Sequence, residues 1–425
     1  MSEAARHLGW RSGAGLIVAN MIGVGVLTST GYMASDLGPA TILIVWLLGG
    51  VLAISGARSY AALAQIIPRS GGEYRYVSDL LHPALGYLAG WTSVVVGFSA
   101  PIAVSALVAG AFAATLSPVN PRVVAVALIG GLSLVHAARL DWSRRLQNGL
   151  VWIELLLLVG FVSGGLAFGQ NHFPSWQPVN RAAGFPLSAF VRALFFVAYA
   201  YSGWNTASYL ADEFRDPKRD VARALTVGTL IVTALYLLVN WVFVANLSAE
   251  RLSAWAHGDT ERITLGHLLM ADLAGPRAAQ AMSALVVLAM AALISSMVIA
   301  GPRVCSTMAR DGFLPRAFTE RAGRPPALAV LSQSALAIVL VFSHSFSALI
   351  QNIGAVLTLN SALAVIGLLR ARKRASFSLV APITFLLLAG AMLLYGFFDA
   401  PSSLIWIGGA FALSLVGYRM SPSRR

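Results

Sequence analysis

Two glycine-bearing breaks interrupt long apolar runs of the chain. Gly23-Val24-Gly25 interrupts the first run, and Tyr201-Ser202-Gly203-Trp204-Asn205 interrupts the sixth. Each run holds about 20 mostly apolar residues, which is the length that crosses a bilayer. A helix broken inside the bilayer exposes N–H and C=O groups that hydrocarbon cannot satisfy but a polar ligand can. The two breaks therefore predict a ligand site between the first and the sixth apolar segments.

The composition is that of a membrane protein. Of 425 residues, 57% are hydrophobic and 11% are charged, and the mean hydropathy is +0.74. Soluble domains carry about 25% charged residues. Apolar runs separated by polar loops begin near Ser12, Pro39, Leu85, Arg122, Gly149, Leu187, Ala222, Arg277, Ala327, Phe346, Ser378 and Ser403. The pattern predicts an all-α integral membrane protein of about twelve helices.

The basic residues predict the orientation of the chain. The formal net charge is +13, and most Lys and Arg residues lie at the termini and in the loops after even-numbered runs. By the positive-inside rule, these loops and both termini face the cytoplasm, which predicts a multi-pass protein of the cytoplasmic (inner) membrane with an uncleaved first helix. The orientation of the chain in the membrane thus accounts for its positive net charge, and a nucleic-acid partner is not expected. Cys305 is the single cysteine, so no intramolecular disulfide is expected.

The positions of the two breaks predict an internal repeat. An odd number of helices separates Gly23 from Gly203, so the second block enters the membrane from the opposite side. We expect one transporter domain with a first five-helix repeat over residues 12–169, an inverted second repeat over 187–369, and two further helices over 378–419. Alternatively, Gly23, Gly25 and Gly203 only permit close helix packing, which is common in membranes.

Four separated motifs stand out in the chain. They are the first break with its flanks (20–27, NMIGVGVL), SYAALAQIIPRSGGEYRY over 59–76, YAYSGWNTASYLADEFRDPKRDVARAL over 199–225, and ARDGFLP over 309–315. Together they resemble the motifs of one known family, the amino acid–polyamine–organocation superfamily. The third is most similar to the L-type amino acid permeases. The resemblance implies the leucine-transporter-like fold, with discontinuous first and sixth helices, and the function of a secondary transporter that moves amino acids by alternating access.

The resemblance also implies which residues bind the substrate. An amino acid carboxylate would lie on backbone N–H groups of the first break, at Ile22, Gly23, Val24 and Gly25. The ammonium would meet carbonyl oxygens of the second break, around Tyr199, Tyr201, Ser202 and Gly203. Tyr199 stands where the family often has an aromatic gate, and Asn205 where some cation-specific relatives have a carboxylate.

The acidic residues bear on the substrate class. Of 17 acidic residues, only Glu154 lies well inside an expected span. A buried cationic side chain needs a paired charge. Because Asn205 is neutral, a neutral amino acid is the favoured substrate. A cationic amino acid or polyamine antiporter remains the alternative.

Glu154 stands where many proton-dependent or sodium-independent relatives carry a lysine, and its role is open. Burial disfavours the charged form of a carboxylate, so Glu154 could exchange the coupling proton. It could instead complete a sodium site with Ser295 and Ser296, as in a sodium-coupled symporter. It could also form a structural pair with Arg58, unless Arg58 reaches the cytoplasm. Ala62 replaces the glutamate usual in the second-helix motif, and Arg58 stands one turn earlier.

Other functional classes find little support in the sequence. The seven histidines lack metal-ligand spacing, no G-x-S-x-G motif occurs, and we expect neither a metal nor a cofactor. An enzyme is therefore not expected. A nutrient sensor that binds without transport is the alternative from a different class. The expected partners are an amino acid, a coupling proton or sodium ion, and the lipid bilayer.

Overall fold

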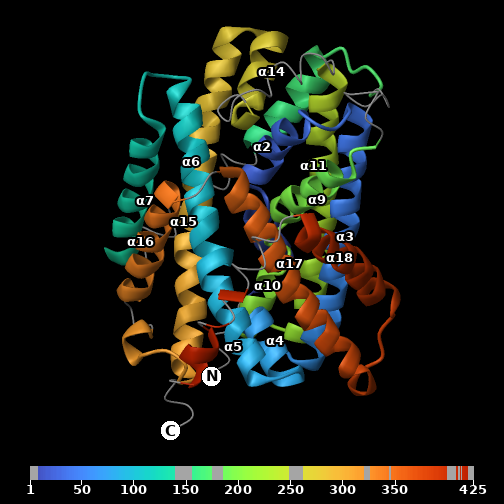
Figure 1. The fold of residues 1–425 in the computed structure, drawn as a ribbon, viewed down its shortest axis with the longest axis vertical. Coiled ribbons are helices and arrows are strands. Elements are labelled where there is room, and N and C mark those ends of the chain that lie inside the picture. The colour runs from blue at the N-terminus through green and yellow to red at the C-terminus, as the bar shows by residue number, and fades with distance from the viewer. Residues whose placement is uncertain are drawn as a thin grey trace.

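The computed structural model is helical through nearly all of the chain that it describes (Figure 1). The described residues are 8–138, 156–174, 185–247, 262–319, 326–343, 346–399 and, near the C-terminus, 408–409, 412 and 414–419. Within these ranges the only β pairing is a single parallel bridge between Leu8 and Phe214. Glu154 lies outside the described residues, so its predicted roles have no structural counterpart here.

Seven helical segments of the described chain are long and apolar enough to cross a membrane. They are α1–α2 (Trp10–Met33), α3 (Pro39–Ile66), α5–α6 (Pro83–Ala114), α11 with its preceding turn (Pro217–Asn246), α15 (Pro276–Arg310), α17 (Phe346–Arg370) and α18 (Val380–Asp399). Shorter apolar helices are α7 (Pro121–Ala138), Leu156–Phe168, α9 (Leu187–Ala200), α14 (Leu265–Ala274) and α16 (Ala327–Ser343). Apart from α14, each of these helices coincides with one of the apolar runs predicted from the sequence.

The first apolar segment consists of two helices. Helix α1 (Trp10–Met21) ends before Ile22, and α2 (Val24–Met33) begins after Gly23. Ile22 and Gly23 are extended, so the helical hydrogen-bond ladder stops between them. The first N–H groups of α2 therefore lack partners within their own helix.

The sixth apolar segment is interrupted as well. Helix α9 (Leu187–Ala200) ends at a turn of Tyr201–Asn205, after which the short helix α10 (Thr206–Tyr209) begins. Gly203 has a φ of 98°, a value that a residue with a Cβ rarely adopts. A Cβ at this position would lie 2.7 Å from the carbonyl oxygen of Asn20. Glycine thus allows the turn and brings it against the end of α1.

Helices α3, α9, α11 and α15 surround the two interruptions. Helix α11 (Ala222–Asn246) packs along α1 and α3, while α2 packs on α9 and α15 packs on α6 (Ala100–Ala114). Figure 1 shows α14 at one end of this bundle, and α4 (Gly72–Leu80), α5 (Pro83–Thr92) and the N-terminus at the other. The arrangement places the interruptions inside the bundle.

Candidate functional site

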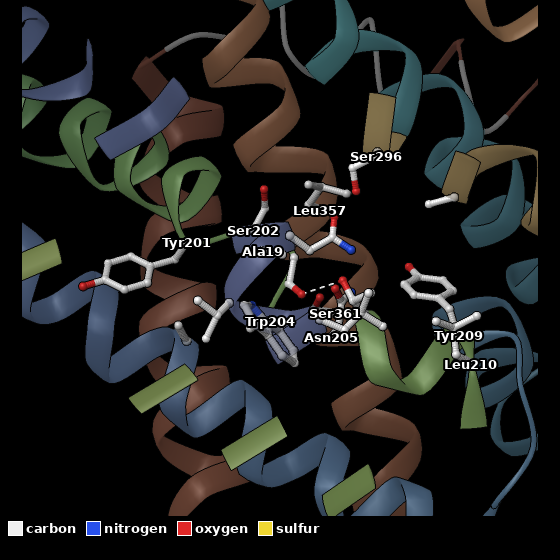
Figure 2. Close-up of a pocket in the computed structure, with 18 of the residues that line it drawn as sticks. Ala19, Tyr201, Ser202, Trp204, Asn205, Tyr209, Leu210, Ser296, Leu357 and Ser361 are labelled. Atoms are coloured by element: carbon white, nitrogen blue, oxygen red, sulfur yellow. Dashed lines mark hydrogen bonds between the residues drawn. The ribbon is translucent and has the colours of Figure 1, made fainter. Parts of the chain in front are cut away.

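A cavity of about 1030 Å³ lies beside the two interruptions. Helix α1 contributes Ala19 and Asn20, and the α9–α10 turn contributes Tyr201 to Asn205. Further parts of the wall come from α3, α4, α11, α15, α17, α18 and the residues around Ser93, where the helix between α5 and α6 widens into a π-helical turn. Figure 2 shows Ser202, Trp204 and Asn205 of the turn, Ser296 of α15, and Ser361 of α17 around this space. Residues far apart in sequence thus share one chamber.

Only some of the predicted binding residues line this cavity. Tyr201, Ser202, Gly203 and Asn205 do so. Ile22 and Tyr199 are buried, and Ile22, Gly23, Gly25 and Tyr199 are not part of the lining. Val24 begins α2. The second interruption therefore faces the chamber, whereas the first contributes the end of α1 on its N-terminal side.

The glycines of the first interruption lie in close packing. A Cβ on Gly25 would clash with the backbone of Ala200 in α9, and one on Gly23 would lie 2.8 Å from Leu293 Cδ2 in α15. Absence of a side chain lets α2 approach both helices. These contacts fit the packing alternative for both glycines.

Tyr236 of α11 ties the two interruptions together. Its hydroxyl lies against the carbonyl oxygen of Met21, the last residue of α1, and 3.2 Å from that of Ala200, the last residue of α9. The side chain is fully buried. Both carbonyls lie at helix ends, where no donor within their own helix is available. Nothing in the local sequence marks Tyr236, because its partners come from two distant helices.

The two serines of α15 have different surroundings. Ser296 lines the cavity, whereas Ser295 is fully buried, and its Oγ lies 2.8 Å from Nε2 of His136 on α7. Consecutive residues of a helix point about 100° apart, so the two hydroxyls face different neighbours. The structure therefore does not bring Ser295 and Ser296 together on the cavity wall. Arg58, the other residue invoked around Glu154, is exposed on α3.

A buried carboxylate lies directly behind the cavity wall. Glu73, in the first turn of α4, is 2% exposed. It accepts hydrogen bonds from Asn205 Nδ2, from the Tyr209 hydroxyl, and from the Tyr60 hydroxyl at 2.8 Å. Asn205 and Tyr209 line the cavity. The sequence prediction singled out Glu154 as the acidic residue well inside an expected span and placed the others in loops or at helix ends. It therefore did not identify Glu73, in the first turn of α4, as a buried carboxylate.

The cavity reaches the end of the bundle that carries α4 and α5. Trp10 and Arg11 of α1 line it there, together with Arg303 and Thr307 of α15. Tyr74 lines the same region and donates a hydrogen bond to Asp311 Oδ2 at 2.7 Å. Burial and the neighbouring Asp311 carboxylate raise the pKa of Tyr74, so this phenol stays a donor at neutral pH. Within the described part of the chain, the lining contains two arginines and no carboxylate.

An aromatic cluster packs near the end of α2, on the side of the bundle that carries α14. The Tyr32 ring stacks on Phe196 at 5.5 Å and on Phe346 at 5.3 Å between centroids. The Arg262 guanidinium lies 5.6 Å from the centre of the Tyr32 ring. Tyr32 is 8% exposed. These residues are not part of the cavity lining, whereas the lining does include Trp10, Arg11 and Arg303 on the α4 side.

The chain is similar to known proteins over nearly its whole length. A family model described as amino acid permease matches residues 8–418. The chain is 27% identical over 429 residues to the Asc-type amino acid transporter 1 of Mus musculus, covering 93% of the chain and 77% of that protein. It is 28% identical over 437 residues to the large neutral amino acids transporter small subunit 2 of Rattus norvegicus, covering 97% and 79% respectively.

The match also decides several predictions made from the sequence. The predicted family is confirmed, and so are a multi-pass membrane protein and the absence of an enzymatic function. A third relative, the b(0,+)-type amino acid transporter 1 of Mus musculus, is 28% identical over 256 residues, covering 58% of the chain and 53% of that protein. Because the family model spans nearly the whole chain, the chain belongs to the amino acid permease family and is an amino acid transporter.

Proposed function

We propose that the protein carries a neutral amino acid across the cytoplasmic membrane by alternating access, and that the substrate binds in the cavity beside the two interruptions. The observation that carries the proposal is that the end of α1 and the α9–α10 turn line one chamber. The N-terminus of α2 offers partial positive charge to a carboxylate, and carbonyl oxygens of the turn offer partial negative charge to an ammonium. The α2 N-terminus and the carbonyl oxygens of the turn thus complement the α-carboxylate and the α-ammonium that amino acids share.

The cavity lining supports a neutral side chain on the substrate. Of the described residues, Arg11 and Arg303 line the chamber and no carboxylate does, so a cationic side chain would meet no paired charge there. The name of one relative, a large neutral amino acids transporter, points the same way. The cationic amino acid or polyamine antiporter remains the competing function, and the following experiment separates the two.

Substrates are expected to need both a free α-carboxylate and a free α-amine. In proteoliposomes containing the purified protein, neutral L-amino acids should compete with one another for uptake, while their methyl esters and N-acetyl forms should compete at least about tenfold more weakly, because each removes one charged hydrogen-bonding group. Competition by putrescine, a diamine without a carboxylate, would favour the antiporter. Binding of amino acids without any uptake or exchange would favour the sensor.

The inverted repeat supports the alternating-access mechanism. We assign 12–169 and 187–369 to the two repeats and 378–419 to the additional helices. The packing of the Tyr32 ring on the α14 side and the extension of the cavity toward Arg303 fit one end state of such a cycle. With the basic loops in the cytoplasm, that state faces inward.

Chemical labelling is expected to find the Arg303 end of the cavity open to the cytoplasm. Cys305 is buried, so Cys305→Ser provides a cysteine-free parent with little change at the surface. Thr307→Cys in this parent should react with a membrane-impermeant maleimide in inside-out vesicles and much more slowly in right-side-out vesicles, because Thr307 lines the cavity. The parent alone should stay unlabelled. The reverse sidedness would overturn the orientation.

A further inference from the structure

Glu73 is a buried carboxylate that contacts both the scaffold and the cavity wall. Gly71 and Gly72, with φ values of 128° and 53°, turn the chain into α4 and direct Glu73 inward. Its three hydrogen-bond donors come from α3, the α9–α10 turn and the end of α10. Among the described residues, no basic side chain forms an ion pair with Glu73.

Three neutral side chains donate hydrogen bonds to the carboxyl oxygens of Glu73. A buried carboxylate is costly unless its oxygens accept hydrogen bonds, and here Oε1 accepts from Tyr60 and Asn205 while Oε2 accepts from Tyr209. The N-terminal end of α4 adds a favourable partial positive charge. The side chain is therefore held as an acceptor in a fixed position.

This acceptor determines which atom of the Asn205 amide faces the substrate. Asn205 donates a hydrogen bond to Glu73 Oε1, so its amide is turned with Nδ2 toward Glu73. Asn205 Oδ1 has no hydrogen-bond partner among the described residues, and the side chain lines the cavity. The oxygen is thus left as an acceptor for a ligand in the chamber.

Two backbone oxygens of the same turn already accept hydrogen bonds within the turn and α10. Gly203 O already accepts from Thr206 N at 3.1 Å and from Thr206 Oγ1 at 2.7 Å. Asn205 O accepts from Ser208 N at 2.9 Å and from Ser208 Oγ at 2.6 Å. A carbonyl oxygen has two lone pairs, so both groups have their acceptor sites filled. The Asn205 side-chain oxygen therefore supplies an acceptor that these two carbonyls do not.

We propose that Glu73 is a positioning residue for substrate recognition: it orients Asn205 so that the amide oxygen receives the α-ammonium of the amino acid. The proposal rests on the proposed function, since it assumes that an amino acid occupies this cavity. It adds that recognition of the ammonium depends on a side chain that does not itself line the chamber.

The experiment exchanges the carboxylate and the amide. Binding is measured on purified protein with tritiated L-alanine, L-serine, L-leucine and L-phenylalanine. Glu73→Gln should raise the Kd of the tightest of these by at least about tenfold, because glutamine donates from Nε2 and lets Asn205 turn its oxygen away from the cavity. The double variant Glu73→Gln with Asn205→Asp should recover most of that loss, because the introduced aspartate accepts from the introduced glutamine and again presents an oxygen to the ligand.

Two further variants control for loss of structure. Tyr60→Phe removes one donor to Glu73 from a side chain that is fully buried and outside the cavity, so it should change the Kd by less than about threefold. If Glu73→Gln does not fold, Asn205→Leu takes its place, because it removes the oxygen itself. It should also cost at least about tenfold in Kd.

The outcomes separate this inference from the proposed function. If the wild type binds none of the four amino acids, the proposed function fails and the inference fails with it. If the wild type binds and the folded Glu73→Gln protein keeps its Kd, only the role of Glu73 is overturned. A loss in Glu73→Gln that the double variant does not recover at all also overturns it, since that pattern belongs to a structural role.

Discussion

Replacing Gly203 with valine is expected to weaken amino acid binding by more than about 100-fold. Gly203 has a φ of 98°, and a left-handed conformation costs about 1–2 kcal/mol for an L side chain, with a β-branched one disfavoured further. The new Cβ would also lie 2.7 Å from Asn20 O, so the turn must move away from α1. Either change separates the α9–α10 turn from the end of α1, which together line the cavity. Equilibrium binding of radiolabelled L-amino acids to purified protein measures the effect.

Gly275 offers a matched control for the backbone strain. It has a φ of 83°, yet a Cβ placed on it would meet no atom within 4 Å. It precedes α15 at the end of the bundle that carries α14, away from the cavity lining. Gly275→Val should therefore share the conformational cost and keep the wild-type affinity. Equal affinity losses in the two variants, or none in Gly203→Val, would contradict a binding role for the second interruption.

The interruptions were predictable because their cause is local. A helix inside a membrane is normally continuous, so glycines within two otherwise apolar runs point to places where the helix stops. Helix α1 does end at Met21, and α9 ends at Ala200, just before the predicted segments. The predicted apolar runs coincide with helices in the same way, because length and hydropathy are properties of a single stretch of chain.

The surroundings of Glu73 could not be derived from the local pattern. Its donors Tyr60, Asn205 and Tyr209 lie 13, 132 and 136 positions away in sequence. Its own neighbours, Ser70-Gly71-Gly72 and Tyr74-Arg75-Tyr76, are those of a polar loop, which predicts an exposed carboxylate. The packing of α4 against α5, α17 and α10, together with the hydrogen bond from Tyr60 of α3, surrounds the side chain. The same limit applies to Tyr236, whose two carbonyl partners belong to α1 and α9.

The angular spacing of residues along a helix explains why Ser295 and Ser296 have different neighbours. Adjacent serines were assigned together from sequence, although their side chains point about 100° apart. Ser296 is turned to the cavity, and Ser295 is turned to His136. A sodium site that uses both hydroxyls on one wall would require Ser295 to turn away from His136. Proton coupling is proposed to depend on Glu154.

Replacing Glu154 with glutamine is expected to abolish net uptake driven by an inward proton gradient, while amino acid binding persists. Glutamine resembles the protonated carboxyl in shape but cannot release a proton, so a coupled cycle stops at the step that needs deprotonation. Uptake into proteoliposomes with an imposed pH gradient measures the loss, and exchange against internal amino acid at equal pH should continue.

The serine variants discriminate between proton and sodium coupling. With a proton as the coupling ion, Ser296→Ala should leave the response to the pH gradient intact. Ser295→Ala should mainly lower the thermal stability of the protein, because the buried His136 nitrogen loses its 2.8 Å hydrogen-bond partner, a change of about 1–3 kcal/mol. With sodium as the coupling ion, wild-type uptake would require sodium, and both serine variants would shift the sodium dependence. Loss of folded protein in Glu154→Gln and Arg58→Gln alike would instead indicate a structural pair, since either change leaves one charge unpaired.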